Sequence, residues 1–333
     1  MTGKDDQKWD EERLRDRCQE IVVRDHAHPD AIGLIDRALK SGVRVAWWTF
    51  DEFYGRDSKF LDALDQRTQR FVGEIPRNTR VWTRKPDVIT EESSTGRDRP
   101  KHPPRVADHQ RPCEVRHLLK HSSKFYLQSW QMYRIKDIQK GPEVWKIKHL
   151  TVWRQTSEHL PSTRLTLIIA VNVRTGETKF FLANAVAGED GVTLRALLRV
   201  AFGRWAIEAE LRVSKEELGM DHFEVRGWRC IHRHYFVTGL SFLLCSRIRQ
   251  SLDKHDTREL TVEQVRRSLN CWLQYHDLPP NLRDEKFEKE LHDQRYYQHR
   301  NAQAIKSHTK TRVGLYLKLG IKVDKIKSCV QIQ

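Results

Sequence analysis

Helix-like and strand-like segments alternate within residues 29–75, and this alternation constrains the fold more than any other feature of the chain. Residues 29–40 and 58–66 carry apolar side chains at helical spacing. Val43–Phe50 and Arg70–Ile75 are runs rich in β-branched and aromatic residues, as in buried strands. Two helices that alternate with two strands predict a parallel α/β sheet.

Asp51 is the first candidate site residue, because it directly follows the first predicted strand. Ligands of open α/β sheets bind beside the carboxyl ends of the strands. Tyr54 and Gly55 then provide a turn. We therefore expect the Asp51 carboxylate to lie at the ligand-binding edge of the sheet.

A second candidate is a charged stripe on the predicted helix that contains residues 204–215. At about 100° per residue, Glu208 lies roughly 40° and Lys215 roughly 20° from Arg204. A carboxylate is a hard oxygen ligand for a divalent ion, and neighbouring cations can contact a phosphodiester. The alternative is a solvated ion pair on a surface helix.

The middle of the chain is predicted to be rich in strands. Residues 84–112 are rich in Pro, Arg, Ser and Asp and predict an excursion without regular structure, and Glu114–Ser122 predicts a short helix. Three strand-like runs follow, at Glu143–Trp153, Leu165–Val173 and Thr178–Leu182.

The last third is predicted to be helical. A helix beginning near Gly191 is expected to lead into the charged stripe, and residues 228–248 are apolar enough to predict a buried helix. Residues 261–275 predict an amphipathic helix, and residues 282–310 a long polar helix after a Pro-Pro break. We accordingly predict four parts: 1–80 with Asp51, a β-rich insertion over 80–190, the Glu208 helix and core helices over 191–255, and a basic helical region over 256–333.

The charge of the chain favours a polyanionic partner. Sixty Lys and Arg residues face 45 Asp and Glu residues, and the net charge of +15 is spread along the chain. Nucleic acid is the first candidate partner for such a protein. No apolar run approaches the roughly 20 residues of a membrane span, and the N-terminal segment is not a signal peptide. Six scattered cysteines without a CxxC pair predict reduced thiols and a cytoplasmic location.

Other residues have weaker functional interpretations. Trp130, Trp145 and Trp153 lie among basic residues and could stack on bases or form part of a β-layer core. Lys306, Lys310 and Arg312 belong to a basic run that could contact phosphates or be a solvated helix end. Cys230, His232 and His234, with His222 nearby, could suggest zinc, but their spacing does not converge on one helix face.

Taken together, these motifs resemble bacterial insertion-sequence transposases with a DDE active site. Arg204-x3-Glu208-x6-Lys215 matches the Arg-Glu-Lys part of their Tyr-Arg-Glu-Lys signature, and the surrounding words RWAIE, KEELGMDH and EVRGW followed by HRH are also similar. FDEFYG resembles the Asp-x-x-Tyr-Gly turn that carries the second catalytic Asp. The position expected to hold the signature tyrosine is Ala201, with Phe202 beside it.

The resemblance implies an α/β fold: a ribonuclease H-like core that a mostly β insertion interrupts between Asp51 and Glu208, with a helical C-terminal region. The first catalytic Asp of the family lies on the first core strand, and neither Asp25 nor Asp30 fits that role. We therefore expect a partial core that lacks its first strands, from an N-terminally truncated copy or the second half of a split reading frame.

The chemistry implied by the resemblance is metal-dependent cutting of DNA and joining of the freed 3′-hydroxyl to target DNA. Asp51 and Glu208 would be the catalytic metal ligands, with Mg²⁺ or Mn²⁺ as the ion. Arg204 and Lys215 would contact the DNA near the scissile phosphate. With one acidic ligand missing, we expect the chain to be catalytically impaired.

The implied partners are double-stranded DNA, as transposon ends and target, and the chain itself or a full-length transposase, on the bacterial nucleoid in the cytoplasm. Two alternatives stay open. One is a non-catalytic DNA-binding remnant that acts as a poison subunit, and the other is a basic RNA-binding protein.

Overall fold

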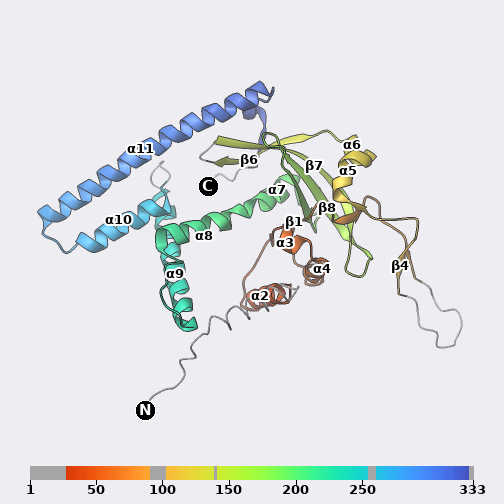
Figure 1. Ribbon diagram of the computed structural model, residues 1–333, viewed down its shortest axis with the longest axis horizontal. Helices are drawn as coiled ribbons and strands as arrows, with labels where there is room; N and C mark the ends of the chain where they lie inside the picture. The colour runs from red at the N-terminus through yellow and green to blue at the C-terminus, as the bar shows by residue number, and fades with distance from the viewer. Residues whose placement is uncertain (1–27, 91–102, 139–140, 254–259, 330–333) are drawn as a thin grey trace, which may run out of the picture. The chain divides into compact units, whose positions relative to one another are not determined.

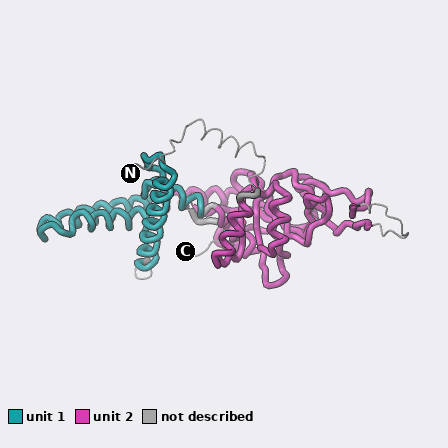
Figure 2. Tube along the Cα trace, turned by 90° about the horizontal axis from the view of Figure 1, so that it is seen from below, with its two compact units in different colours: residues 1–25, 205–307 teal, residues 26–204, 308–333 magenta. Residues whose placement is uncertain are grey.

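The computed structural model describes residues 28–90, 103–138, 141–253 and 260–329, and these form two compact units. We call the part made of residues 205–307 the helical unit. The rest of the described chain before residue 205, together with residues 308–329, forms the sheet unit. Figure 2 shows the two units in separate colours.

The sheet unit combines short helices with a mixed β-sheet. Its helices are α2 (His28–Lys40), α3 (Glu52–Gly55), α4 (Ser58–Gln66), α5 (Val115–His121), α6 (Ser123–Tyr126) and α7 (Leu194–Gly203). Its strands are β1 (Val72–Glu74), β2 (Arg80–Trp82), β3 (Val88–Ile89), β4 (Arg105–Val106), β5 (Cys113–Glu114), β6 (Gln131–Ile138), β7 (Gly141–Gln155), β8 (Pro161–Asn172), β9 (Thr178–Ala183) and β10 (Lys327–Ser328).

The centre of the sheet consists of β7, β8 and β9, which pair side by side. Its order is β1-β9-β8-β7-β2-β5, while β6 also pairs with β7 and β10 pairs with β6. Figure 1 labels β6, β7 and β8 in this sheet. The long β7 accommodates two neighbours on one side, because its first half pairs with β6 and its second half with β2. All these pairs are antiparallel except the one between β6 and β10.

Strand β8 is buried on both faces of the sheet. Ile168 and Ala170 point into the core that contains Leu197 and Leu198 of α7. The alternate residues, Leu165, Leu167 and Ile169, point into the opposite core, which contains apolar residues of α5 and α6. Because successive side chains of a strand point to opposite faces, an unbroken apolar run is required where both faces are covered.

The N-terminal part confirms the predicted alternation but shortens the strands. Helices α2 and α4 match the predicted helices, and β1 lies within the predicted second strand. The first predicted strand, Val43–Phe50, is wrong as a regular buried strand. It forms one parallel bridge, between Trp48 and Phe71, and Val43 is half exposed. In this part of the chain the predicted parallel pairing holds only for this contact, because the strand that pairs with β1 is β9, which runs antiparallel to it.

The three strands predicted in the middle of the chain are confirmed as β7, β8 and β9, and the short helix as α5. Strand β6 was missed, as were strands of two or three residues, which are too short to show periodicity. The described ends of the 84–112 excursion pair as β3 and β4. β1 and the strands after residue 80 belong to one sheet, which therefore crosses the predicted boundary at 80. The predicted domain boundaries remain a prediction.

The helical unit contains α8 (Trp205–Leu218), α9 (Trp228–Asp253), α10 (Val262–Tyr275) and the first part of α11 (Pro280–Lys318). These helices confirm the predicted helical C-terminal region. Helix α10 begins with a capping box in which Thr261 and Gln264 exchange hydrogen bonds. Among the described residues, no helix has the length and hydropathy of a membrane span.

The prediction that residues 228–248 form a buried helix is half wrong. Helix α9 does form, and Cys245 packs with Val265 of α10. Phe236, Val237 and Leu240, however, are about half exposed or more. The sequence shows apolar side chains around the whole helix, but only one face contacts α10 and α8.

The protein is thus a mixed α/β structure with a central mixed sheet and a helical C-terminal region. This arrangement is consistent with a partial ribonuclease H-like fold.

Two glycines provide a test of how tightly β1 is packed. A Cβ at Gly73 would overlap the Phe50 ring, whereas a Cβ at Gly33 on α2 would meet no atom. We expect Gly73→Ala to lower the free energy of unfolding by about 2 kcal/mol, a typical overpacking cost. Gly33→Ala should be neutral or stabilising by about 0.5–1 kcal/mol, because alanine favours a helix. Urea unfolding of both variants measures the difference. Equal stability of the two would contradict the packing described here.

Candidate functional site

Asp51 lies where the extended segment 43–50 ends and α3 begins. The segment is held against β1 by three backbone hydrogen bonds: Trp48 N–H donates to Arg70, Val72 N–H to Trp48, and Glu74 N–H to Phe50. Asp51 is the N-cap of α3, and its Oδ1 accepts from the backbone N–H groups of Phe53 (3.1 Å) and Tyr54 (3.4 Å). These bonds fix the direction of the carboxylate and use only one of its two oxygens.

The turn after Asp51 is fixed by close packing. Gly55 sits so near the backbone of Glu74 that a Cβ there would overlap the Glu74 carbonyl oxygen. Phe50 packs edge-on against Phe60 of α4, with ring centroids 5.2 Å apart, and also contacts Phe71. Gly55 and Phe50 of the FDEFYG motif are therefore required by the packing of this turn, whereas Phe53 is 49% exposed.

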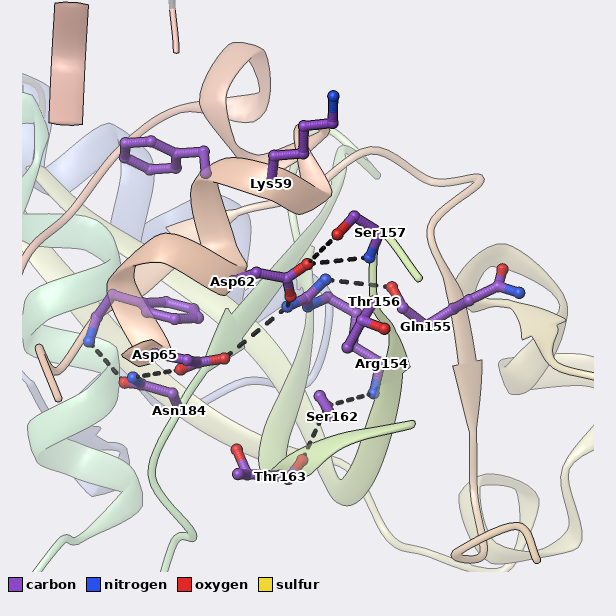
Figure 3. A network of polar contacts seen from close by, with 12 residues as sticks. Lys59, Asp62, Asp65, Arg154, Gln155, Thr156, Ser157, Ser162, Thr163 and Asn184 are labelled. Carbon is purple, nitrogen blue, oxygen red and sulfur yellow. Dashed lines mark hydrogen bonds and ion pairs between the residues drawn. The ribbon is translucent and has the colours of Figure 1, made fainter. Parts of the chain in front are cut away.

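A buried charge network joins α4 to the β7–β8 end of the sheet (Figure 3). The Arg154 side chain of β7 is 2% exposed, and its Nη2 lies 2.5 Å from Oδ1 of Asp62. Oδ2 of Asp62 accepts from the backbone N–H and the hydroxyl of Ser157. Asp65, one turn further along α4, lies 3.8 Å from Arg154 and accepts from Asn184. The network links α4 to β7, to the turn after β7 and to the residue that follows β9.

The two carboxylates of this network have opposite pKa shifts. Burial alone would raise the pKa of Asp62, but the hydrogen bonds from Ser157 and Arg154 outweigh it, so its pKa is lowered. Burial raises the pKa of Asp65, and the hydrogen bond from Asn184 only partly offsets the effect. Asp62 is therefore the group that neutralises Arg154.

This network was not predicted from the sequence. Asp62 and Asp65 are spaced three residues apart on a predicted helix, and Arg154 follows Trp153 in a predicted strand. One signal was present: Val152 and Arg154 share a strand face, so an arginine lies in line with an apolar core position. The identity of its partner was not visible, because Asp62 lies far away in the sequence.

The second predicted carboxylate, Glu208, lies in the first turn of α8 and is exposed, as is Lys215 in the last part of that helix. Arg204 is the C-cap of α7 and precedes α8, so it does not share a continuous helix with the other two. Arg204 and Asp51 belong to the sheet unit and Glu208 and Lys215 to the helical unit. The predicted convergence of Asp51 and Glu208 stays a prediction.

The predicted DNA-contacting residues differ in exposure. Trp130 is half-buried, and its ring lies 4.8 Å from Nζ of Lys148. Trp145 is 3% exposed and packs against Phe202, so its ring offers no face to a base in this conformation. Lys306 and Lys310 are exposed. Arg312 is half-buried and donates to the Gly141 carbonyl oxygen. These assignments remain predictions.

The histidines that were considered as possible zinc ligands make other contacts. His234 Nε2 lies 2.8 Å from the Gly219 carbonyl oxygen, and His232 stacks edge-on against Trp228. Within the described ranges, no group of three or more His, Cys, Asp or Glu side chains is arranged to hold a metal ion. Asp51 and Glu208 nevertheless carry carboxylate oxygens, the donor type that Mg²⁺ and Mn²⁺ prefer.

The Arg154 network can be tested with a matched pair of variants. Asp62→Asn should lower the free energy of unfolding at pH 7 by about 3 kcal/mol, because Arg154 would stay buried without its counter-charge. Asp65→Asn should change it by less than about 1 kcal/mol, because its 3.8 Å contact with Arg154 exceeds hydrogen-bond length. Denaturant unfolding at several pH values measures both effects.

The pH dependence of the Asp62 effect has a defined sign. A carboxylate with a lowered folded-state pKa stabilises the fold above its usual pKa of 3.8, and this contribution is lost as the pH falls through the folded-state value. The stability gap between wild type and Asp62→Asn should therefore shrink below about pH 4. An equal cost for the two variants at pH 7 would contradict the assignment of Asp62 as the counter-charge.

A comparison with protein families gives one match in this chain. Residues 4–142 match the model of a DDE superfamily endonuclease. The matched region contains Asp51 and its turn, and it ends before Glu208. No curated protein matches the chain. The family match supports a DDE transposase-like family, and with it transposase or nuclease activity, for which the substrate is DNA and a divalent metal is generally required.

Proposed function

We propose that the chain is a DNA transposase of the DDE type in which Asp51 and Glu208 are metal ligands. The observation that carries the proposal is the position of Asp51, at the end of the segment paired with β1 and inside the region that matches a DDE superfamily endonuclease. One of its oxygens is fixed by two amides, which leaves the other to coordinate an ion.

The position of Glu208 in the chain also supports the proposal. It follows Arg204, the C-cap of α7, by four residues. Helix α7 is anchored in the sheet core through Leu197, Leu198 and Ala201. The spacing Arg204-x3-Glu208-x6-Lys215 is also the one that resembles the transposase signature.

Carboxylates at these two positions fit Mg²⁺ or Mn²⁺, which would activate the attacking oxygen and stabilise the leaving oxygen of a phosphodiester. Asp51 presents an oriented ligand, and Glu208 supplies a second one from α8. Arg204 and Lys215 neutralise the phosphate charge and hold the strand in place. The exposed Lys306 and Lys310 provide further phosphate contacts.

We also propose that the chain by itself is catalytically impaired. Its motifs assign two of the three acidic ligands that the DDE type uses. The loss of one charged ligand weakens the binding of the ion. Every 1.4 kcal/mol of lost binding free energy corresponds to about a tenfold loss of affinity. A full-length transposase, or a second copy of this chain, would then be a partner on DNA in the bacterial cytoplasm.

A second candidate function is non-catalytic occupation of DNA. The observation that favours it is that the family match ends at residue 142 and does not include Glu208. Both functions predict duplex binding that weakens steeply with salt, since the net charge is +15. They differ in whether Asp51 and Glu208 bind metal.

The metal site can be tested by Mn²⁺ titration followed by calorimetry. Asp51→Asn and Glu208→Gln should each lower Mn²⁺ affinity at least about tenfold, because each removes one charged ligand. Asp57→Asn and Glu216→Gln are the controls. Asp57 caps α4 through the same kind of bonds as Asp51 caps α3, and Glu216 is exposed on the same helix as Glu208.

Equal affinity in wild type and all four variants would overturn the metal assignment and favour the non-catalytic candidate. A plasmid-nicking assay in Mg²⁺ tests the impairment separately. Nicking by wild type no faster than by Asp51→Asn supports it. Fast nicking that Asp51→Asn and Glu208→Gln each abolish would support the two ligands and refute the impairment.

A further inference from the structure

A groove in the sheet unit is formed where the end of α11 and the segment after it approach the first residues of β6. Its volume is about 540 Å³. The groove is lined by Gln131, Met132, Gly320, Ile321, Lys322, Lys325, Ile326 and Lys327. None of these residues belongs to the proposed metal site or to the basic run at 306–312.

The apolar residues at the bottom of the groove pack against a buried core. Ile321 and Ile326 pack against a small core made of Val144, Tyr316 and Val323. The Tyr316 hydroxyl accepts from the backbone N–H of Val144, which ties α11 to β7. Beyond this core, Lys327 and Ser328 pair with β6 as β10. The lysines that line the groove are therefore attached to an ordered part of the fold.

The charge of the groove is positive. Lys322, Lys325 and Lys327 are exposed and form no ion pair among the described residues. No carboxylate is among the lining residues, although the exposed Asp324 is adjacent in sequence. Lys146 lies directly opposite Met132 in the β6–β7 register, so its side chain rises from the same face of the sheet. The groove is suited to a ligand with more than one negative charge.

The groove also has an apolar side. Met132 is 37% exposed, and Ile321 and Ile326 are partly exposed beside it. A duplex presents phosphates and base edges to a protein, but its base faces are stacked on one another. Apolar side chains next to lysines match a nucleotide whose base is unstacked, because its planar face can then leave water while its phosphates meet the cations.

We infer that this groove binds single-stranded DNA, with the phosphates on Lys322, Lys325 and Lys327 and an unpaired base on Met132, Ile321 and Ile326. The choice of DNA among polyanions rests on the proposed function. The groove would hold a strand that is already separated from its complement, at a site distinct from Asp51 and Glu208.

The inference is tested by fluorescence anisotropy with labelled oligothymidylate of about 12 nucleotides, a length within the usual site size for single strands. The full chain is used in EDTA, so that metal-dependent chemistry plays no part. The triple variant K322A/K325A/K327A should bind the oligonucleotide at least tenfold more weakly. Its salt dependence should be shallower by about 2 in log–log slope, since three phosphate contacts are lost.

The matched control is K286A/K289A/R295A, which removes the same charge from exposed positions of α11 in the helical unit. It should retain most of the affinity. Met132→Ala tests the base contact: it should weaken binding of oligothymidylate several-fold and leave binding of a duplex unchanged. Circular dichroism and thermal melting of each variant establish that it is folded.

Equal losses of oligonucleotide affinity in the two triple variants would overturn the inference. The affinity would then depend on the net charge of the chain and not on the lysines of the groove. Equal effects of Met132→Ala on single strand and duplex, or equally tight binding of inorganic polyphosphate, would overturn the base contact. Single-strand binding with these properties but no Mn²⁺ site at Asp51 would support the groove and refute the proposed metal centre. The reverse result would refute the groove alone.

Discussion

The buried guanidinium of Arg154 is the constraint on which the arrangement around Asp51 depends. A charge that is 2% exposed is tolerated in a protein interior only when an opposite charge and hydrogen bonds compensate it. Asp62 meets that requirement from α4, and this fixes α4 against β7. Phe60 on the same helix packs against Phe50, the residue before Asp51. An ion pair outside the proposed metal site therefore supports the turn that holds Asp51.

The second constraint is that both faces of the central sheet are covered. Strand β8 is buried on both sides, and α7 packs on one of them. Helix α7 ends at Arg204, so the chain enters the helical unit from an anchored point. The two proposed ligands therefore differ in support. Asp51 is held by its own turn, whereas Glu208 depends on the helix that follows α7.

The sequence predicted the elements whose pattern is local. Helices α2 and α4 and strands β7, β8 and β9 were found because each carries its own periodicity, and α10 has an N-cap threonine followed by glutamine three residues later. The same reasoning failed where structure depends on a distant partner. Val43–Phe50 has the composition of a buried strand, but β1 offers only three residues to pair with it.

In the candidate site, too, the local features were predicted from the sequence, and the contacts between distant residues were not. The position of Asp51 after a run rich in β-branched and aromatic residues was visible in the sequence. Its role as the N-cap of α3 was not predicted, because a turn at Tyr54 and Gly55 was expected there. The ion pair of Arg154 with Asp62 could not be predicted, because neither residue indicates the other across the intervening chain. The exposed apolar face of α9 shows the same limit, since hydrophobicity predicts burial without saying which face is covered.

The central claim is that one metal ion is bound by both Asp51 and Glu208, and iron-directed cleavage of the polypeptide tests it most directly. Fe²⁺ that replaces Mg²⁺ generates hydroxyl radicals in the presence of ascorbate and peroxide, and these cut the chain near the bound ion. We expect two groups of cuts, one near residue 51 and one near residue 208, and excess Mg²⁺ should suppress both. Cuts near only one of these residues, or cuts that Mg²⁺ does not suppress, would contradict the claim.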